Sequence, residues 1–304
     1  MNLSGVMTQL IALFLMMAVG YAVAKTGLIT PDFRKKLSSL VLMTAAPGSI
    51  LSAALQSNIA GREMLVVLLV AAAFYVILSL LAKVMVVPMR SRPSQAKVDQ
   101  LMLIFTNVGF MGIPVVESVY GATGVAMVSM FILSFNLMFY SYGVMLISDS
   151  MHFDPKALKN PCIFAALGAL FFALTGLRLP QPLNVALTSL GAMNTPLAML
   201  VIGASLCHSD IRAALTNPRL YKIGLARMLI IPVITLFVIR LLPIRPMLAG
   251  VTVIMAAMPV AGNCALLSDM YTPDDTAASH AVIVTTLMSA ATLPLICSLI
   301  SIAL

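Results

Sequence analysis

Charged residues are scarce in this sequence. Only 9% of its 304 residues are charged, whereas 61% are hydrophobic, and the mean hydropathy is +1.05. A soluble domain averages about 25% charged residues, because its surface must face water. Eighteen Lys and Arg with ten Asp and Glu cannot cover such a surface. The composition therefore excludes a soluble globule and predicts that lipid surrounds the chain.

Residues that bind metals or carry out catalysis are also scarce. The four cysteines lack metal-ligand spacing and any pairing pattern, at Cys162, Cys207, Cys264 and Cys297. The three histidines fall in or beside loops, at His152, His208 and His280. An intramembrane enzyme needs a nucleophile with a base, or a metal cluster. We therefore expect no enzyme, no catalytic residue, no metal and no organic cofactor.

The net charge of +8 does not indicate nucleic-acid binding. The basic residues lie between apolar runs, as in cytoplasmic membrane loops, and do not form one basic surface. A hydrocarbon core about 30 Å thick needs roughly 20 apolar residues of helix. Ten such runs are present, at 5–24, 37–55, 64–82, 98–116, 124–147, 161–177, 185–206, 220–242, 248–268 and 281–303. They do not alternate polar and apolar residues, so we expect helices rather than a barrel.

Lys and Arg also predict the orientation of these spans. Loops after odd-numbered spans hold thirteen of them and loops after even-numbered spans hold four, which places both termini outside. The run 5–24 has no basic residue before it and Lys25 after it, so we interpret it as a retained first span rather than a signal peptide.

Two halves of the chain resemble each other. Thr26-Gly27-Leu28 through Pro31 matches Thr175-Gly176-Leu177 through Pro180 at an offset of 149, and the same offset carries Pro47 onto Pro196. We therefore predict a five-helix repeat at 1–148, a cytoplasmic linker at 149–160 and a second repeat at 161–304. Five is odd, so the second copy enters the membrane from the opposite side, as in many secondary transporters.

The fourth and ninth spans are interrupted at corresponding places. Gly and Pro there disrupt the helical hydrogen bonds, and an asparagine accompanies them in each. Freed amides at a half-helix N-terminus favour an anion. These residues are our candidates for substrate binding: Asn107, Gly109, Gly112, Pro114, Pro259, Gly262 and Asn263.

A second pair of proline-containing spans supplies further substrate-binding candidates, namely Pro47 and Ser49 in the second span and Asn194, Thr195 and Pro196 in the seventh. These residues either line the same cavity or pack helix against helix. Both interpretations stay open at this point.

Three charged residues are candidates for function. Arg227 lies about 10 Å into the eighth span at helical rise, where it either pairs with a substrate carboxylate or reaches back to the headgroups. Glu117 and Asp269 occupy nearly matching places at the far ends of the fourth and ninth spans. They are candidates to bind a coupling ion, H+ or Na+, unless they are merely solvated.

The sequence resembles the auxin efflux carrier family of the bile acid/auxin/arsenite transporter superfamily. The resemblance covers essentially the full length and rests on four stretches, 40–51, 107–114, 227–232 and 257–271. It implies an all-α membrane protein of ten helices in two inverted five-helix repeats, with a scaffold part and a transport part in which broken helices 4 and 9 cross. Bacterial members of the family resemble this chain in lacking a long central loop.

The resemblance implies substrates such as malate- and malonate-like carboxylates. The Asn-Pro motif of the plant carriers is absent, because Val108 follows Asn107, which argues against auxin itself. We expect a permease of the bacterial inner membrane with periplasmic termini. Its expected partners are a small organic anion and the lipid bilayer, and a homodimer is left open. A channel or a non-transporting sensor for such a ligand is the alternative.

Overall fold

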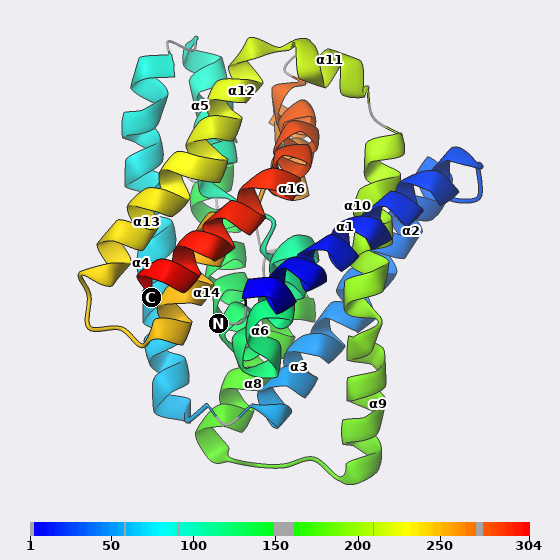
Figure 1. Ribbon diagram of the computed structural model, residues 1–304, viewed down its shortest axis with the longest axis vertical. Helices are drawn as coiled ribbons and strands as arrows, with labels where there is room; N and C mark the ends of the chain where they lie inside the picture. The colour runs from blue at the N-terminus through cyan, green and yellow to red at the C-terminus, as the bar shows by residue number, and fades with distance from the viewer. Residues whose placement is uncertain (1–2, 58, 90–91, 149–160, 209, 272–275) are drawn as a thin grey trace. The chain divides into compact units, whose positions relative to one another are not determined.

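The computed structural model describes residues 3–57, 59–89, 92–148, 161–208, 210–271 and 276–304. Within these residues the chain is almost entirely helical (Figure 1). The helices of the first half are α1 Leu3–Lys25, α2 Pro31–Leu40, α3 Ala46–Gln56, α4 Gly61–Val86, α5 Pro93–Ile104, α6 Ile113–Met138 and α7 Val144–Ser148. Those of the second half are α8 Pro161–Thr175, α9 Gln181–Ala192, α10 Asn194–Cys207, α11 Ile211–Thr216, α12 Pro218–Leu225, α13 Ile231–Arg240, α14 Pro246–Ala256, α15 Gly262–Tyr271 and α16 Ala277–Ala303.

Short π-helical turns join several of these helices. They are η1 Val41–Ala45, η3 Val108–Gly112, η4 Phe139–Gly143 and η6 Ala226–Ile230. A 3-10 turn, η2 Val87–Met89, follows α4. π-helical turns are rare in proteins, and those that occur often lie at functional sites. The turns η3 and η6 are therefore candidates for such a site.

Six helical stretches of the described residues are long and apolar enough to cross a membrane: Pro31–Gln56, Gly61–Met89, Val108–Ser148, Gln181–Cys207, Pro218–Arg240 and Ala277–Ala303. Three shorter apolar helices lie at Leu10–Lys25, Pro161–Thr175 and Pro246–Ala256. Each of the ten predicted runs carries helix. The number of membrane crossings and the inverted symmetry remain predictions.

Gly121 divides the longest of these stretches. Its φ of 61° and ψ of −155° are not helical, and two helices meet at this residue within α6. A positive φ is readily adopted only by glycine, because it has no Cβ. The residue therefore separates the segment that contains Glu117 from the rest of α6, close to the predicted boundary between the runs 98–116 and 124–147.

The chain packs into two compact units. The first consists of residues 1–70, 108–133 and 158–208, and the second of residues 71–107, 134–157 and 209–304. Each unit thus draws on both sequence halves. The proposed repeats at 1–148 and 161–304 describe similarity along the chain, whereas the units describe packing, and the linker at 149–160 lies outside the described residues.

Close glycine contacts hold the first unit together. Helix α1 crosses and contacts α10 (Figure 1), and a Cβ built on Gly20 would come within 2.5 Å of the Leu200 carbonyl oxygen. A Cβ on Gly203 would collide with the Met17 carbonyl oxygen. Small residues permit this approach of two backbones, as is usual where apolar helices pack in lipid.

We expect Gly203→Ala to lower the stability of the protein by about 1–3 kcal/mol, the usual cost of overpacking. The added methyl group meets backbone, which cannot rotate away. Gly109→Ala is the matched control, because nothing lies within 4 Å of a Cβ at Gly109. Thermal unfolding of the purified protein in detergent measures both. Equal melting temperatures for the two variants would contradict this account of the contact.

Candidate solute-binding site

Two helices of the second unit are interrupted where the sequence predicts breaks. Helix α5 ends at Ile104, and residues 105–107 are not helical before η3 begins at Val108. Helix α14 ends at Ala256, and α15 begins at Gly262. Each interruption frees backbone amides and carbonyls that a continuous helix would pair internally.

The two interruptions pair with each other. The Asn107 N–H donates to the Pro259 carbonyl oxygen at 2.9 Å, and the Ala261 N–H donates to the Phe105 carbonyl oxygen at 3.0 Å. Thr106 and Val260 form an antiparallel bridge between these bonds. The crossing is therefore a two-residue β-pairing inside a helical unit, and we call residues 105–107 and 257–261 the crossover.

A threonine of a third helix completes this pairing. The Val260 N–H, which points away from the bridge, donates to the Thr285 hydroxyl of α16 at 3.1 Å. The same hydroxyl donates to the Ala281 carbonyl oxygen at 2.6 Å. Thr285 is fully buried, so it fixes one strand of the crossover with both of its hydrogen-bonding functions satisfied.

The polar side chains beside the crossover are more accessible than its backbone. Asn107 and Asn263 are half-buried and Gly262 is exposed, whereas Pro259 and Val260 are buried. A Cβ at Gly262 would meet nothing within 4 Å. Space beside the α15 N-terminus is thus open, and a solute there would meet amide side chains and a half-helix N-terminus.

Three predicted break residues lie after the non-helical segment 105–107. Gly109 and Gly112 lie within η3, and Pro114 lies in the first turn of α6, so all three follow the interruption and belong to the first unit. Proline is compatible with the first turn of a helix, because an N–H there has no intrahelical partner. The non-helical segment 105–107 therefore ends before these three residues, and their part in shaping the break stays a prediction.

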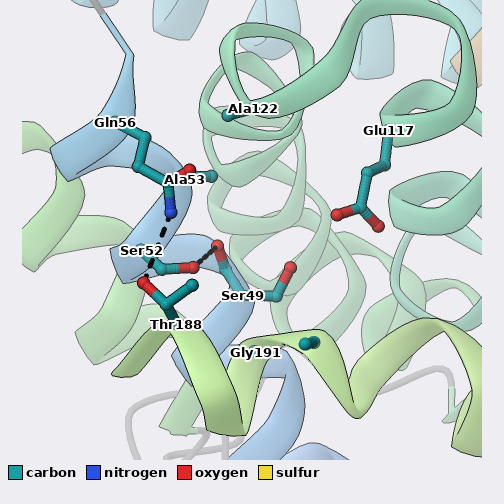
Figure 2. Close-up of a pocket in the computed structure, with 9 residues that line it drawn as sticks. Ser49, Ser52, Ala53, Gln56, Glu117, Ala122, Thr188 and Gly191 are labelled. Atoms are coloured by element: carbon teal, nitrogen blue, oxygen red, sulfur yellow. Dashed lines mark hydrogen bonds between the residues drawn. The ribbon is translucent and has the colours of Figure 1, made fainter. Parts of the chain in front are cut away.

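The first unit contains a polar cavity of about 130 Å³ (Figure 2). It is lined from α3, α6 and α9 by Ser49, Ser52, Ala53, Gln56, Glu117, Ala122, Thr188, Gly191 and Ala192. Figure 2 shows the Glu117 carboxylate and the Ser49 hydroxyl pointing into the same space. A cavity with one carboxylate and several hydroxyl groups offers oxygen ligands, the type that hard cations prefer.

Hydrogen bonds fix the polar groups around this cavity. The Thr195 hydroxyl donates to Glu117 Oε2 at 2.8 Å, and Gln56 Nε2 donates to the Thr188 hydroxyl at 3.4 Å. Ser52 donates to the Ser49 carbonyl oxygen at 3.1 Å. The structure thus brings together Ser49, Thr195 and Glu117, which the sequence places in three different spans.

The helices that carry the second candidate pair also pack closely. A Cβ on Gly191 would lie 2.8 Å from the Ser49 Cα, and Pro47 and Pro196 lie in the first turns of α3 and α10. Close packing therefore occurs in this pair, and of its five candidates Ser49 lines the cavity of the first unit; a role for them in the site at the interrupted helices stays a prediction. Asn194 is 1% exposed, and neither polar atom of its side chain has a hydrogen-bond partner.

Arg227 lies in η6 and is fully buried in protein. A side chain that reaches the headgroups must be exposed at its tip, and Arg227 is not. Within the part of the chain that the structure describes, none of its three guanidinium nitrogens has a hydrogen-bond partner. The side chain of the remaining ionic candidate, Asp269, lies outside the described residues, as does His152.

Sequence reasoning missed several residues that the structure brings into these sites. They are Thr106 and Thr285 at the crossover, Tyr75 near Arg227, and Ser52, Gln56 and Thr188 in the cavity. Hydroxyl groups are common in membrane helices and carry no spacing signal. Asp99 could have been found from the sequence, because it is an acidic residue at the start of an apolar run, 98–116. It is fully buried and forms an ion pair with Arg219 at 2.7 Å.

Comparisons with known proteins agree with the helical, apolar character of the chain. The profile of a family described as "Membrane transport protein" matches residues 5–155 and 150–297. An "Uncharacterized transporter" of Methanothermobacter thermautotrophicus is 26% identical over 294 residues, which are 94% of this chain and 95% of that protein. The similarity therefore spans both sequence halves and both compact units.

We expect Thr285→Val to destabilise the protein by about 1–3 kcal/mol, because the buried Val260 N–H would lose its partner. Thr252→Val is the matched control. Thr252 is also buried, but its hydroxyl donates only to the Leu248 carbonyl oxygen of its own helix. Chemical or thermal denaturation in detergent compares the stability of the two variants. If Thr285→Val loses no more stability than Thr252→Val, Thr285 does not fix the crossover.

Proposed function

Because the chain belongs to the auxin efflux carrier family of membrane transport proteins, we propose that it is a secondary transporter that moves a small mono- or dicarboxylate by alternating access. The paired interruptions of α5/η3 and α14/α15 carry this proposal. Non-helical backbone at membrane depth persists only where it is buried or lines a polar cavity, and in secondary transporters such interruptions form the substrate site.

The solute would bind beside the crossover in the second unit. The N-terminus of α15 carries partial positive charge, and Asn107 and Asn263 supply amide donors for carboxylate oxygens. Both asparagines are half-buried, which suits groups that must meet a solute and release it again. A carboxylate of malate or malonate size is the substrate class that the family resemblance favours.

The membrane arrangement follows as part of the proposal. Ten spans in two inverted repeats would place both interruptions at equivalent depth and both termini outside, in the inner membrane of a bacterium. Helix in each of the ten predicted runs supports this count. Alternating access also needs two bodies that keep their own packing while they move, and the division of the chain into two compact units is compatible with this requirement.

Counterflow in proteoliposomes tests the proposal. Vesicles loaded with unlabelled malonate or malate are expected to accumulate the labelled acid through the wild-type protein. We expect Asn107→Leu to reduce this exchange at least tenfold, because an apolar side chain leaves carboxylate oxygens without a donor, a loss of about 1.4 kcal/mol or more. Asn184→Leu, in the first turn of α9, is the control and should exchange normally.

The outcomes separate the candidate functions. A channel shows uptake without counterflow, and a sensor binds the acid but moves none. Full exchange by Asn107→Leu, with insertion and melting temperature unchanged, would remove the crossover from the proposed site.

We place ion coupling at Glu117. Its carboxylate lies in the cavity of the first unit and accepts the Thr195 hydroxyl, a setting that can exchange H+ or Na+. We expect Glu117→Gln to abolish the stimulation of uptake by an imposed H+ or Na+ gradient while counterflow persists. The reason is that a neutral amide can neither take up a proton nor offer a negative charge to Na+. Glu63→Gln, in the first turn of α4, is the control. Measuring uptake with each gradient alone identifies the ion, and unchanged stimulation by both would exclude Glu117.

A further inference from the structure

A cluster of buried polar groups in the second unit has no hydrogen-bond partner among the described residues. Arg227, Tyr75 and Thr106 are each 0% exposed. The three guanidinium nitrogens, the phenol oxygen and the threonine hydroxyl all lack a hydrogen bond. Buried polar groups are almost always satisfied, so five unsatisfied atoms in one region call for a physical explanation.

These three side chains belong to one neighbourhood. Tyr75 and Cys264 lie near Arg227, and the Thr106 hydroxyl lies near the Tyr75 hydroxyl, without the geometry of a hydrogen bond. Thr106 is a crossover residue, so the cluster adjoins the pairing of α5 and α14. Arg227 itself projects from the π-helical turn η6.

The neighbouring groups do not neutralise Arg227. A guanidinium stays protonated in proteins, and a buried charge without a counter-charge costs several kcal/mol. Cys264 directs its thiol to the Leu101 and Phe105 carbonyl oxygens at 3.7 and 3.8 Å, so it acts as a neutral donor. The buried carboxylate of Asp99 is engaged by Arg219. The positive charge therefore lacks an anion among the described groups of this unit.

The chemistry of the cluster specifies the missing ligand. A guanidinium offers five N–H donors in a planar fork, and the two hydroxyl groups add one donor each. Donors without an acidic neighbour select an anion, and one buried positive charge balances one negative charge. A halide fits such a set of donors, and so does a single carboxylate group, which a guanidinium binds through two parallel hydrogen bonds.

We propose that Arg227, Tyr75 and Thr106 form a binding site for a small monovalent anion next to the crossover. The anion is either a resident halide or one carboxylate group of the transported acid. The carboxylate form rests on the proposed function, whereas the halide form does not.

Anion-dependent stability of the purified protein tests this site. The protein is kept in methanesulfonate at constant ionic strength, and bromide, chloride, acetate or malonate replaces part of it. A ligand that binds only the folded state raises the melting temperature in proportion to RT ln(1 + [L]/Kd). We expect a saturable rise for the wild type, and an anomalous-scattering peak of bromide beside Arg227 in crystals soaked with that ion.

Three variants and two controls locate the effect. Arg227→Gln is expected to abolish the saturable rise, and Tyr75→Phe and Thr106→Val are expected to weaken the apparent affinity about three- to tenfold, the loss of one hydrogen bond each. Arg240→Gln, at the end of α13, and Tyr221→Phe, in α12, are matched controls that should respond as the wild type does. If Arg227→Gln fails to fold, Tyr75→Phe and Thr106→Val carry the test.

The outcomes also identify the source of the anion. A response to bromide and chloride alone indicates a resident halide, and a response to acetate and malonate alone indicates the solute carboxylate; mutual competition indicates one site for both. No saturable response in the wild type, or the same response in all the variants, would show that water alone solvates Arg227 and would overturn the inference. The melting-temperature test does not depend on transport, so Asn107→Leu separates the two proposals. If this variant loses counterflow but keeps the bromide response, the anion site remains supported.

Discussion

Unpaired backbone in a medium without water is the constraint on which this structure depends. An amide or carbonyl that leaves a helix inside an apolar bundle must find another partner or lose several kcal/mol. The interruptions at 105–107 and 257–261 meet this requirement for each other, through the bonds from Asn107 to Pro259 and from Ala261 to Phe105. Each break therefore depends on the other for these backbone partners.

The same constraint governs the buried side chains around the crossover. Thr285 satisfies the remaining Val260 amide, and Asp99 with Arg219 forms a buried ion pair between α5 and α12. Arg227 is different, because its burial is complete and its donors are unused. The crossover backbone and Asp99 thus have partners, whereas the Arg227 guanidinium has no counter-charge among the described residues, and this contrast is the basis for the anion site that we propose.

Much of this site was predictable from local sequence. The asparagines, Pro259 and Gly262 mark the breaks because helix propensity fails there whatever the surroundings. Gly109, Gly112 and Pro114 follow the non-helical segment, because glycine is compatible with the π-helical turn η3 and proline with the first turn of α6. Tyr75, Thr106 and Thr285 gave no signal at all, because a buried hydroxyl is identified by the group it meets, and that group lies in another helix.

The sequence by itself determined the class of the protein. Its few charged residues, its apolar runs and its interrupted fourth and ninth spans predict a membrane protein. These features can be interpreted locally, because transfer into lipid and helix propensity act residue by residue. Only the tertiary structure decided that the two breaks pair as a short β-bridge, that Glu117 meets Thr195 and Ser49 around one cavity, and that Arg227 is buried rather than directed to the headgroups. These outcomes depend on which distant segments pack together, and long-range packing is set by the whole chain rather than by any window of it.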